Sequence, residues 1–463
     1  MSQPLPESDA PARPTLTRYL VLFAFCLSAT LAYVHRNCVA VVEKDIRADL
    51  GLTPEQSGWM MSAFLFTYAV FQIPTGAWAQ SWGTRKALSL YAFVWSVMVG
   101  CLSLATGMTS LLLYRLGMGV GQAGVFPCST NSVAKWFPTS QLAQANGAIL
   151  SFMGLGAAAG AVITASLVQS LGWRWTFFVY AIPGVVWAAW FYWWFRDYPQ
   201  DHPSVNAAEL ALIRGTLSSP SPDVVAETPS VDSISQQPVQ VELPEPTPWG
   251  LILTSPTMGF ICAQHFFRAA GVQFYQSWFT TYLREERNLN LTQAGFLTSL
   301  PLIGVAVGSL LGGRISDRLL VYTGSRRISR QLLSVICLLI CSGLILVAYR
   351  IEDVRHAVYV LSLGSFIAAC AGSSAYTITI DVGGKHIAPV FGMMNMFGNF
   401  GAMACPVLVP LLVKHGGWNS VFYTFSGVYV AAAISWMLLN PERTITAPAP
   451  VESQKENTRD ATR

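Results

Sequence analysis

The sequence predicts an all-α polytopic membrane protein built from two similar halves, each with six membrane-spanning helices. Three observations lead to this prediction. Of the 463 residues, 52% are hydrophobic and only 11% are charged, whereas soluble domains carry about 25% charged residues. Apolar runs of about 20 residues, the length that spans a bilayer as a helix, recur along the chain. A long polar stretch divides these runs into two groups of six.

The first half is expected to hold six helices between residues 17 and 195, after a polar, proline-rich tail over residues 1–16. The first apolar run is too long for the core of a signal peptide and lacks an Ala-x-Ala cleavage pattern, so we expect a retained helix. The polar stretch 43–56 is expected to be a loop. The expected helices cover residues 17–42, 56–79, 86–106, 109–134, 143–169 and 174–195.

The composition changes sharply after the sixth helix. Residues 196–248 are rich in Pro, Ser, Glu and Val without apolar periodicity, which is typical of a flexible linker. One short helix is expected within it, near residues 207–214. Six more helices are expected over residues 249–440, followed by a polar tail over residues 441–463. These helices cover residues 249–283, 293–320, 330–349, 355–380, 387–414 and 418–439.

Lys and Arg are denser on the side of the membrane that carries the termini and the linker. Because positively charged loops face the cytoplasm, we expect both termini and the linker to be cytoplasmic, in a bacterial inner membrane. Similar basic loops follow the second helix of each half, with Arg85 and Lys86 in the first and Arg326 and Arg327 in the second. This weak internal repeat is typical of transporters made of two related halves.

Three arginines lie inside apolar segments that hold no acidic residue near their middle. They are Arg36 in the first helix, Arg115 in the fourth and Arg268 in the seventh, and the nearest acid, Asp381, falls at the end of its segment. A charge within a membrane segment is costly unless it faces protein or water, so it marks a candidate functional site. We infer that the partner of these cations is the substrate, a small organic anion.

Each arginine also has a structural interpretation. Arg36 can extend to the membrane surface, although six mostly apolar residues follow it. Arg268 can serve packing or an ion pair between the halves, although glutamines and a histidine surround it. Arg115 precedes closely spaced glycines and can serve helix packing and gating without touching substrate. The binding interpretation is a bidentate grip on a carboxylate by Arg36 and Arg268.

Polar side chains in several apolar segments complete the candidate binding site. Tyr68 and Gln72 lie one turn apart and can hydrogen-bond substrate hydroxyls or simply pack. Asn395 and Asn399 are four residues apart, which places them on one face of a helix, and buried amides need partners. Further candidates are Tyr275 and Ser373 for substrate binding, with His35, Gln122, His265 and Asp317 beside Arg115 for coupling or gating.

Several stretches together resemble the anion:cation symporters of the major facilitator superfamily, which include bacterial galactonate, hexuronate and glucarate transporters. The resemblance implies the major facilitator superfamily fold, with two pseudo-symmetric six-helix bundles. It implies that Arg36 binds the substrate carboxylate, helped by Tyr68 and Asn395. It also implies that Arg268 corresponds to an arginine of the vesicular glutamate transporters, and that Arg115 couples binding to gating. The matching stretches are residues 36–42, 68–76, 115–127, 136–138, 171–175, 278–301 and 392–399.

The chain departs from this family pattern where the relatives carry protons. Proton-coupled bacterial relatives have an Asp at the position of His35 and a Glu at the position of Gln122. The loop after the second helix has Gln80 in place of an Asp, which the second half retains as Asp317. Both proton-carrying carboxylates of the family pattern are therefore replaced.

These features favour a secondary transporter of a small organic anion, a sugar acid or other carboxylate, that works by alternating access. Because importing an anion against an inside-negative potential is uphill, we expect coupling to a proton or another cation, or anion exchange. His35 and His265 are the candidate proton carriers. A proton and the anion are expected to bind together at the His35–Arg36 pair, and simple packing of His35 is the alternative.

Other classes of protein fit the sequence less well. The nine cysteines are scattered without a CxxC pair, so the sequence supports neither disulfides nor a metal site, and we expect no cofactor. An enzyme is not expected, because the sequence shows no nucleophile–base constellation. A non-transporting sensor that retains the transporter fold stays open as an alternative. We expect a monomer in the lipid bilayer and no nucleic-acid partner.

Overall fold

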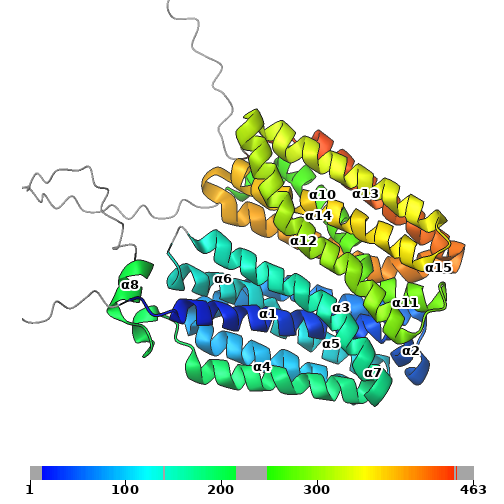
Figure 1. Ribbon diagram of the computed structural model, residues 1–463, viewed down its shortest axis with the longest axis horizontal. Helices are drawn as coiled ribbons and strands as arrows, with labels where there is room; N and C mark the ends of the chain where they lie inside the picture. Colours follow the sequence, from blue (N-terminus) through cyan, green and yellow to red (C-terminus); the bar gives the residue numbers. More distant parts are fainter. Residues whose placement is uncertain (1–12, 139–140, 215–247, 443–444, 446–463) are drawn as a thin grey trace, which may run out of the picture.

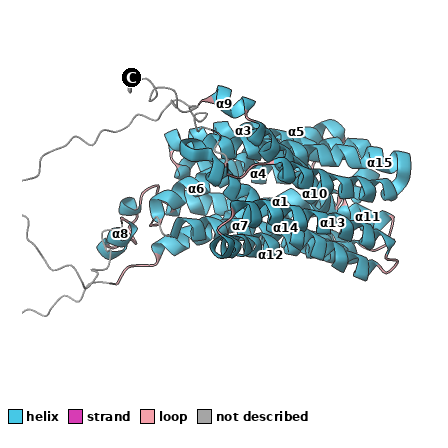
Figure 2. Cartoon of the chain, turned by 90° about the horizontal axis from the view of Figure 1, so that it is seen from above, coloured by secondary structure: helices cyan, strands magenta, loops and turns pink. Residues whose placement is uncertain are grey.

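The computed structural model describes residues 13–138, 141–214, 248–442 and 445. Two bundles of long helices lie side by side, one from each half of the chain (Figure 1). Figure 2, seen at right angles to this view, shows helices along the whole described length and a short helix set apart at one end. The predicted all-α architecture of two six-helix bundles is confirmed.

The first bundle contains six uninterrupted helices, of which α2 is short, and one long helix that folds back on itself. Gly172 interrupts the long helix α7 with a φ of 77°, a conformation that a residue with a Cβ adopts only under strain. The chain turns there, so α7 supplies the fifth and sixth spanning segments. The helices are α1 (Thr17–Val41), α2 (Glu43–Leu50), α3 (Pro54–Trp82), α4 (Thr84–Leu102), α5 (Met108–Ala123), α6 (Val125–Trp136) and α7 (Leu142–Trp194).

The second bundle repeats this plan. Its last helix, α15, also folds back, at Gly416 and Gly417, and a π-helical turn over Arg327–Leu332 leads into α13. The helices are α9 (Trp249–Thr254), α10 (Pro256–Ser277), α11 (Phe279–Glu285), α12 (Leu291–Thr323), α13 (Leu333–Arg350), α14 (Val354–Gly383) and α15 (Ile387–Leu438). Seven of the described helices are long and apolar enough to cross a membrane by length and composition, and α7 and α15 are among them.

The stretch predicted as a loop between the first two spanning helices is partly helical, so the prediction over residues 43–56 is wrong for its first part. Helix α2 has two acids in its first turn, which favour the positive end of the helix dipole, and Arg47 in its last turn. Gly51 ends it with a φ of 62°. The Thr53 side chain and Gln56 then form a capping box that starts α3.

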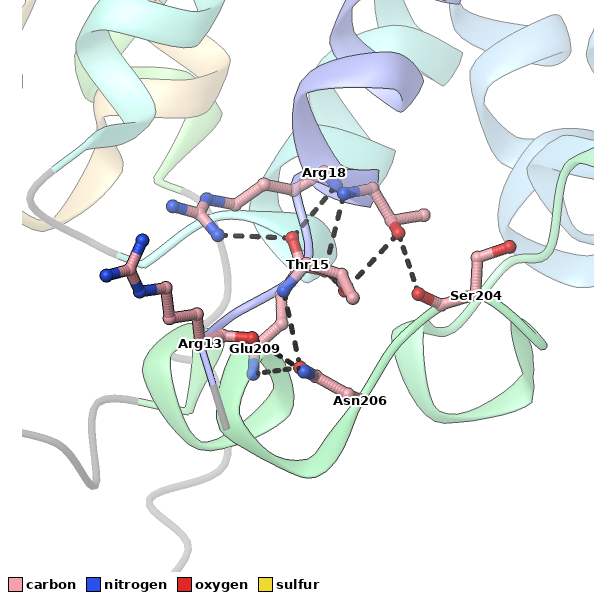
Figure 3. A network of polar contacts seen from close by, with 7 residues as sticks. Arg13, Thr15, Arg18, Ser204, Asn206 and Glu209 are labelled. Atoms are coloured by element: carbon pink, nitrogen blue, oxygen red, sulfur yellow. Dashed lines mark hydrogen bonds and ion pairs between the residues drawn. The ribbon is translucent and has the colours of Figure 1, made fainter. Parts of the chain in front are cut away.

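The first part of the predicted flexible linker is ordered against the first bundle, which corrects the prediction for residues 196–214. The short helix α8 (Ala207–Ile213) forms where the sequence predicts it. Its Glu209 carboxylate accepts hydrogen bonds from the backbone N–H groups of Thr17 and Arg18 and from the Arg18 guanidinium, at 3.1–3.3 Å (Figure 3). It thereby partners N–H groups that a helix start leaves free. Residues 215–247 of the linker lie outside the described residues.

His202 helps to hold this segment in place. Its ring packs edge-on against the indoles of Trp136 and Trp194. Burial lowers the pKa of His202, and the nearby Arg196 lowers it further. A neutral imidazole suits this aromatic setting, so the contact contributes packing and not charge.

The bundles diverge toward the end of the molecule that carries α8 and meet at the end that carries α2 and α11 (Figure 1). Helix α3 packs against α15 and α7 against α12 across the interface. Gly58 permits one of these approaches, because a Cβ on it would overlap the Pro406 carbonyl of α15. The two ends of the interface are called the α8 end and the sealed end below.

Candidate functional site

A cavity of about 530 Å³ lies between the two bundles. Helices α1, α3 and α7 line it from the first bundle, and α10, α12, α14 and α15 from the second. Both halves of the chain thus contribute side chains to one space. The predicted site residues that line this central cavity are Arg36, Tyr68, His265, Arg268, Ser373, Asn395 and Asn399.

Arg36 enters the cavity from α1 within a box of aromatic rings. Its guanidinium carbon lies 4.4 Å from the ring centroids of Tyr33 and Tyr68 and 4.9 Å from that of Phe64. Tyr33 is three residues before Arg36 on α1, and Phe64 and Tyr68 are four apart on α3, so helical periodicity brings the rings together. We call these three rings, of Tyr33, Phe64 and Tyr68, the aromatic box. Their negative faces attract the cation and fix the orientation of the guanidinium group.

Gln122 of α5, which does not line the cavity, forms a hydrogen bond with the same guanidinium. Its Oε1 accepts a hydrogen bond of 3.4 Å from the Arg36 Nε, and its Nε2 donates one of 3.0 Å to the Ala32 carbonyl. The side chain is buried. Helix α5 lies this close because Gly119 has no Cβ, which would overlap the Phe64 carbonyl and the Thr67 hydroxyl. The glycines that follow Arg115 thus serve packing around the site.

Arg115 lies on the far side of the aromatic box from the central cavity. Its guanidinium carbon is 4.7 Å from the Phe64 ring, so that ring lies between two arginines. Its Nε donates to the Met60 carbonyl at 3.4 Å, and the side chain is buried. Arg36 and Arg115 both line a small pocket next to the cavity. The structure therefore places Arg115 behind the site, where it can act on Phe64 and Arg36.

Arg268 enters the cavity from α10 in the second bundle. Its Nη2 lies 3.3 Å from Nδ1 of His265, one turn earlier on the helix. Its Nε is buried without a hydrogen-bond partner among the described residues. Gly372 of α14 makes room for it, because a Cβ there would lie 2.9 Å from the Arg268 Nη1. A guanidinium that lines a cavity without a carboxylate partner among the described residues is suited to bind an anion.

The two candidate asparagines of α15 behave differently. The Asn395 Nδ2 donates a 2.8 Å hydrogen bond to the Gln72 Oε1 of α3, so this pair links the two bundles. Gln72 does not line the central cavity. The Asn399 Nδ2 is buried and has no hydrogen-bond partner in the described part of the chain. Asn399 lines the same cavity as Arg268, although its unpaired amide nitrogen is buried.

Besides Gln72, Arg115 and Gln122, three more predicted residues do not line the cavity. His35 is only 1% exposed, and its ring lies tilted against that of Tyr180 and close to Gly184, both on α7. It faces away from Arg36 because successive residues of a helix are about 100° apart. The structure thus gives no geometric support for joint binding at the His35–Arg36 pair. Tyr275 is buried beside a small apolar pocket. Asp317 is exposed and pairs with Arg330 at 2.9 Å, on the loop side of α12.

Charged and hydroxyl groups of both bundles close the sealed end. Glu43 is fully buried, and its Oε2 accepts a hydrogen bond of 2.9 Å from the Thr281 hydroxyl of the other bundle. Arg47 donates to Glu43 at 2.8 Å and also pairs with Glu285 across the interface. We call this network the α2–α11 seal, and its members are Glu43, Asp45, Arg47, Thr281, Arg284 and Glu285.

Sequence reasoning missed Tyr33 and Glu43. Tyr33 is three residues before Arg36, a spacing that places an aromatic ring beside the cation on one helix face. Glu43 is seven residues after Arg36, which is two helical turns and hence the same face. Both spacings are visible in the sequence. What hides them is that Tyr33 looks like ordinary packing and Glu43 lies in a stretch predicted as a loop.

Comparisons with known proteins show the family to which the chain belongs. The Major Facilitator Superfamily model matches residues 23–388 and 265–462. A protein of Cupriavidus necator named probable sulfoacetate transporter is 28% identical, over 93% of this chain and 96% of its own. The D-galactonate transporter of Escherichia coli is also 28% identical, over 92% and 96%.

The fold agrees with a solved transporter as well. A bacterial homologue of the human lysosomal transporter Spinster, in an inward-facing and occupied conformation, superposes with a TM-score of 0.67 at 17% identity. The match covers 91% of this chain and 94% of that one. The chain belongs to the major facilitator superfamily and resembles its organic-anion transporters, the family expected from the motifs around Arg36, Tyr68 and Asn395.

Proposed function

We propose that this protein transports a small organic acid, a sugar acid or other carboxylate, held between Arg36 and Arg268. The observation that carries the proposal is that two guanidinium groups, one from each bundle, line one cavity that no described Asp or Glu lines. A cation with no protein partner is costly in a membrane protein, so an anion in the cavity is its natural counter-charge. Names of the relatives support this class of substrate.

The shape of the site favours an anion with polar groups at both ends. Arg36 offers the N–H groups that its aromatic box leaves free, which suits the two oxygens of a carboxylate. Arg268 and Asn399 line the opposite wall, where the Arg268 guanidinium has no carboxylate beside it among the described residues. A second carboxylate, a sulfonate or several hydroxyl groups would bind there.

In an alternating-access cycle, the contacts between the two bundles at each end of the cavity would open and close in turn. With the termini and α8 on the cytoplasmic side, as the Lys and Arg distribution indicates, the cavity opens inward and the α2–α11 seal closes the outer side. Opening outward would separate Glu43 from Thr281, Arg47 from Glu285 and Arg284 from Asp45. Binding of the anion between the bundles would favour closure at the α8 end.

A binding experiment followed by a transport experiment tests the proposal. Purified protein is screened by thermal shift against sulfoacetate, D-galactonate, phosphate and an aromatic acid, and uptake of the labelled hits is measured in proteoliposomes. We expect an organic acid to stabilise the protein and to enter the vesicles. Arg36→Ala should abolish both effects, whereas Arg327→Ala, which removes an exposed ion pair with Glu442, should keep both. Stabilisation without uptake would favour a sensor over a transporter.

A further inference from the structure

The acidic groups of the protein leave the cavity cations unpaired in the empty state. Among the described residues, no Asp or Glu lines the central cavity. Two acids toward the ends of the bundles, the buried Glu43 and the half-buried Asp381, lie beside other arginines. Glu43 is paired with Arg47 in the seal, and Asp381 lies 3.5 Å from Arg330 toward the α8 end. An empty cavity between closed bundles therefore holds two guanidinium groups without an anionic partner.

Gln122 has the hydrogen-bond pattern that a protonated carboxylic acid would have at the same position. Its oxygen accepts from the Arg36 Nε, and its nitrogen donates to the Ala32 carbonyl. A protonated glutamic acid would accept and donate to the same two partners through its C=O and O–H groups. A deprotonated one would lose the bond to Ala32 and gain an ion pair with Arg36. The amide is fixed in the first arrangement at every pH.

The histidines near the site do not replace such an acid. The His265 Nδ1 faces the Arg268 guanidinium at 3.3 Å, so this nitrogen accepts a hydrogen bond and a proton on it would meet a fixed positive charge. The His35 ring faces Tyr180 and Gly184 on α7, away from the cavity. The other titratable side chains that line the cavity are the phenols of Tyr33, Tyr68 and Tyr376, and the first two stack on Arg36.

We infer that the transporter is an anion exchanger: Arg36 and Arg268 let the bundles reorient only when an anion lies between them. This inference rests on the proposed function and adds its mode of coupling. Closing the empty cavity would bury two unpaired guanidinium groups, which is strongly unfavourable. A bound organic anion neutralises them, so one anion travels inward and another outward in each cycle. No proton has to accompany either of them.

Proteoliposomes distinguish exchange from proton coupling. Vesicles are prepared either empty or loaded with unlabelled sulfoacetate, and uptake of labelled sulfoacetate is followed with and without an imposed pH gradient. D-galactonate is tested in the same way. We expect loaded vesicles to take up label faster than empty ones by about tenfold or more, because the empty carrier returns slowly. The pH gradient should change neither rate.

Two other outcomes overturn the inference in different ways. If empty vesicles concentrate the label when the outside is acidified, the protein is a proton symporter and the exchange mode is wrong, while the proposed function stands. If neither loaded nor empty vesicles take up either probe, the proposed function fails, and exchange fails with it.

A variant at Gln122 tests the role of the amide directly. Gln122→Glu puts a titratable group in hydrogen-bond reach of Arg36, so its deprotonated form can neutralise the cation in the empty carrier. We expect this variant to gain uptake into empty vesicles that depends on an inward proton gradient, a property that the original protein lacks. Exchange into loaded vesicles shows that the variant is folded. A variant that exchanges but gains no proton-driven uptake contradicts the role assigned to Gln122.

Discussion

Two arginines on the same helix, the buried Arg18 and the half-buried Arg36, have opposite surroundings. At the α8 end, Arg18 lies against the Glu209 carboxylate, which also caps the start of α1 (Figure 3). Five turns further along α1, Arg36 has aromatic rings and an amide around it and no carboxylate among the described residues. The first arrangement is complete without a ligand, whereas the second lacks a counter-charge.

This difference shows how one helix can serve stability at one end and binding at the other. A buried ion pair that satisfies itself resists change, because removal of either partner leaves a buried charge. An arginine held only by rings and an amide is fixed in position, yet its charge stays available. Arg268 resembles Arg36 in lacking a carboxylate but has fewer contacts. We therefore expect Arg36 to be the rigid anchor and Arg268 the adaptable one.

The largest effect on binding is expected from Arg36→Lys. The ammonium keeps the charge but loses the planar fork, the stacking in the box and the hydrogen bond to Gln122. Affinity for the transported anion should fall by about 30-fold or more, which corresponds to the loss of a buried, hydrogen-bonded charge contact. Isothermal titration or a concentration-dependent thermal shift would measure it. Affinity within a factor of two of the original would show that the box, and not the guanidinium, carries the site.

A smaller and selective effect is expected from Arg268→Gln. Affinity for the dianion sulfoacetate should fall by about tenfold to a hundredfold, because one of its two charges loses its partner. Affinity for the monoanion D-galactonate should fall less, since Arg36 still holds its carboxylate and glutamine still donates a hydrogen bond. The ratio of the two affinities is the quantity to measure. An equal loss for both anions would make Arg268 a general structural residue.

A modest effect is expected when the aromatic box is opened. Tyr33→Leu removes one of the rings that stack on Arg36, a contact worth about 0.5–2 kcal/mol, so affinity should fall by about twofold to thirtyfold. Tyr33→Phe keeps the ring and serves as the matched control. If the phenylalanine variant is as weak as the leucine variant, the hydroxyl of Tyr33 and not its ring face contributes to binding.

The smallest effect on transport is expected from a change in the ion pair between Arg18 and Glu209. Glu209→Gln removes the charge from a fully buried carboxylate and leaves Arg18 unpaired, so the melting temperature should fall. Anion affinity should stay unchanged, because the site at Arg36 lies far along α1. Thermal shift with and without anion measures both quantities in one experiment. Loss of affinity without loss of stability would mean that the α8 end communicates with the cavity.

Much of the fold and part of the site follow from the sequence alone. The twelve apolar segments and the unpaired arginines are visible there, because length, hydropathy and charge are local properties. The direction in which His35 points is not visible in the sequence. A shift of one position along a helix decides whether a side chain faces the cavity or a neighbouring helix. The docking of Glu209 on α1 depends on contacts almost two hundred residues apart, which no local pattern shows.

The α2–α11 seal joins the two bundles by ion pairs that run in both directions. Arg47 of the first bundle pairs with Glu285 of the second, and Arg284 of the second pairs with Asp45 of the first. Because salt screens ion pairs where water reaches them, a higher ionic strength should favour the conformation in which this end is open. The closed state at this end is therefore expected to depend on salt, whereas the central cavity depends on the anion that it binds.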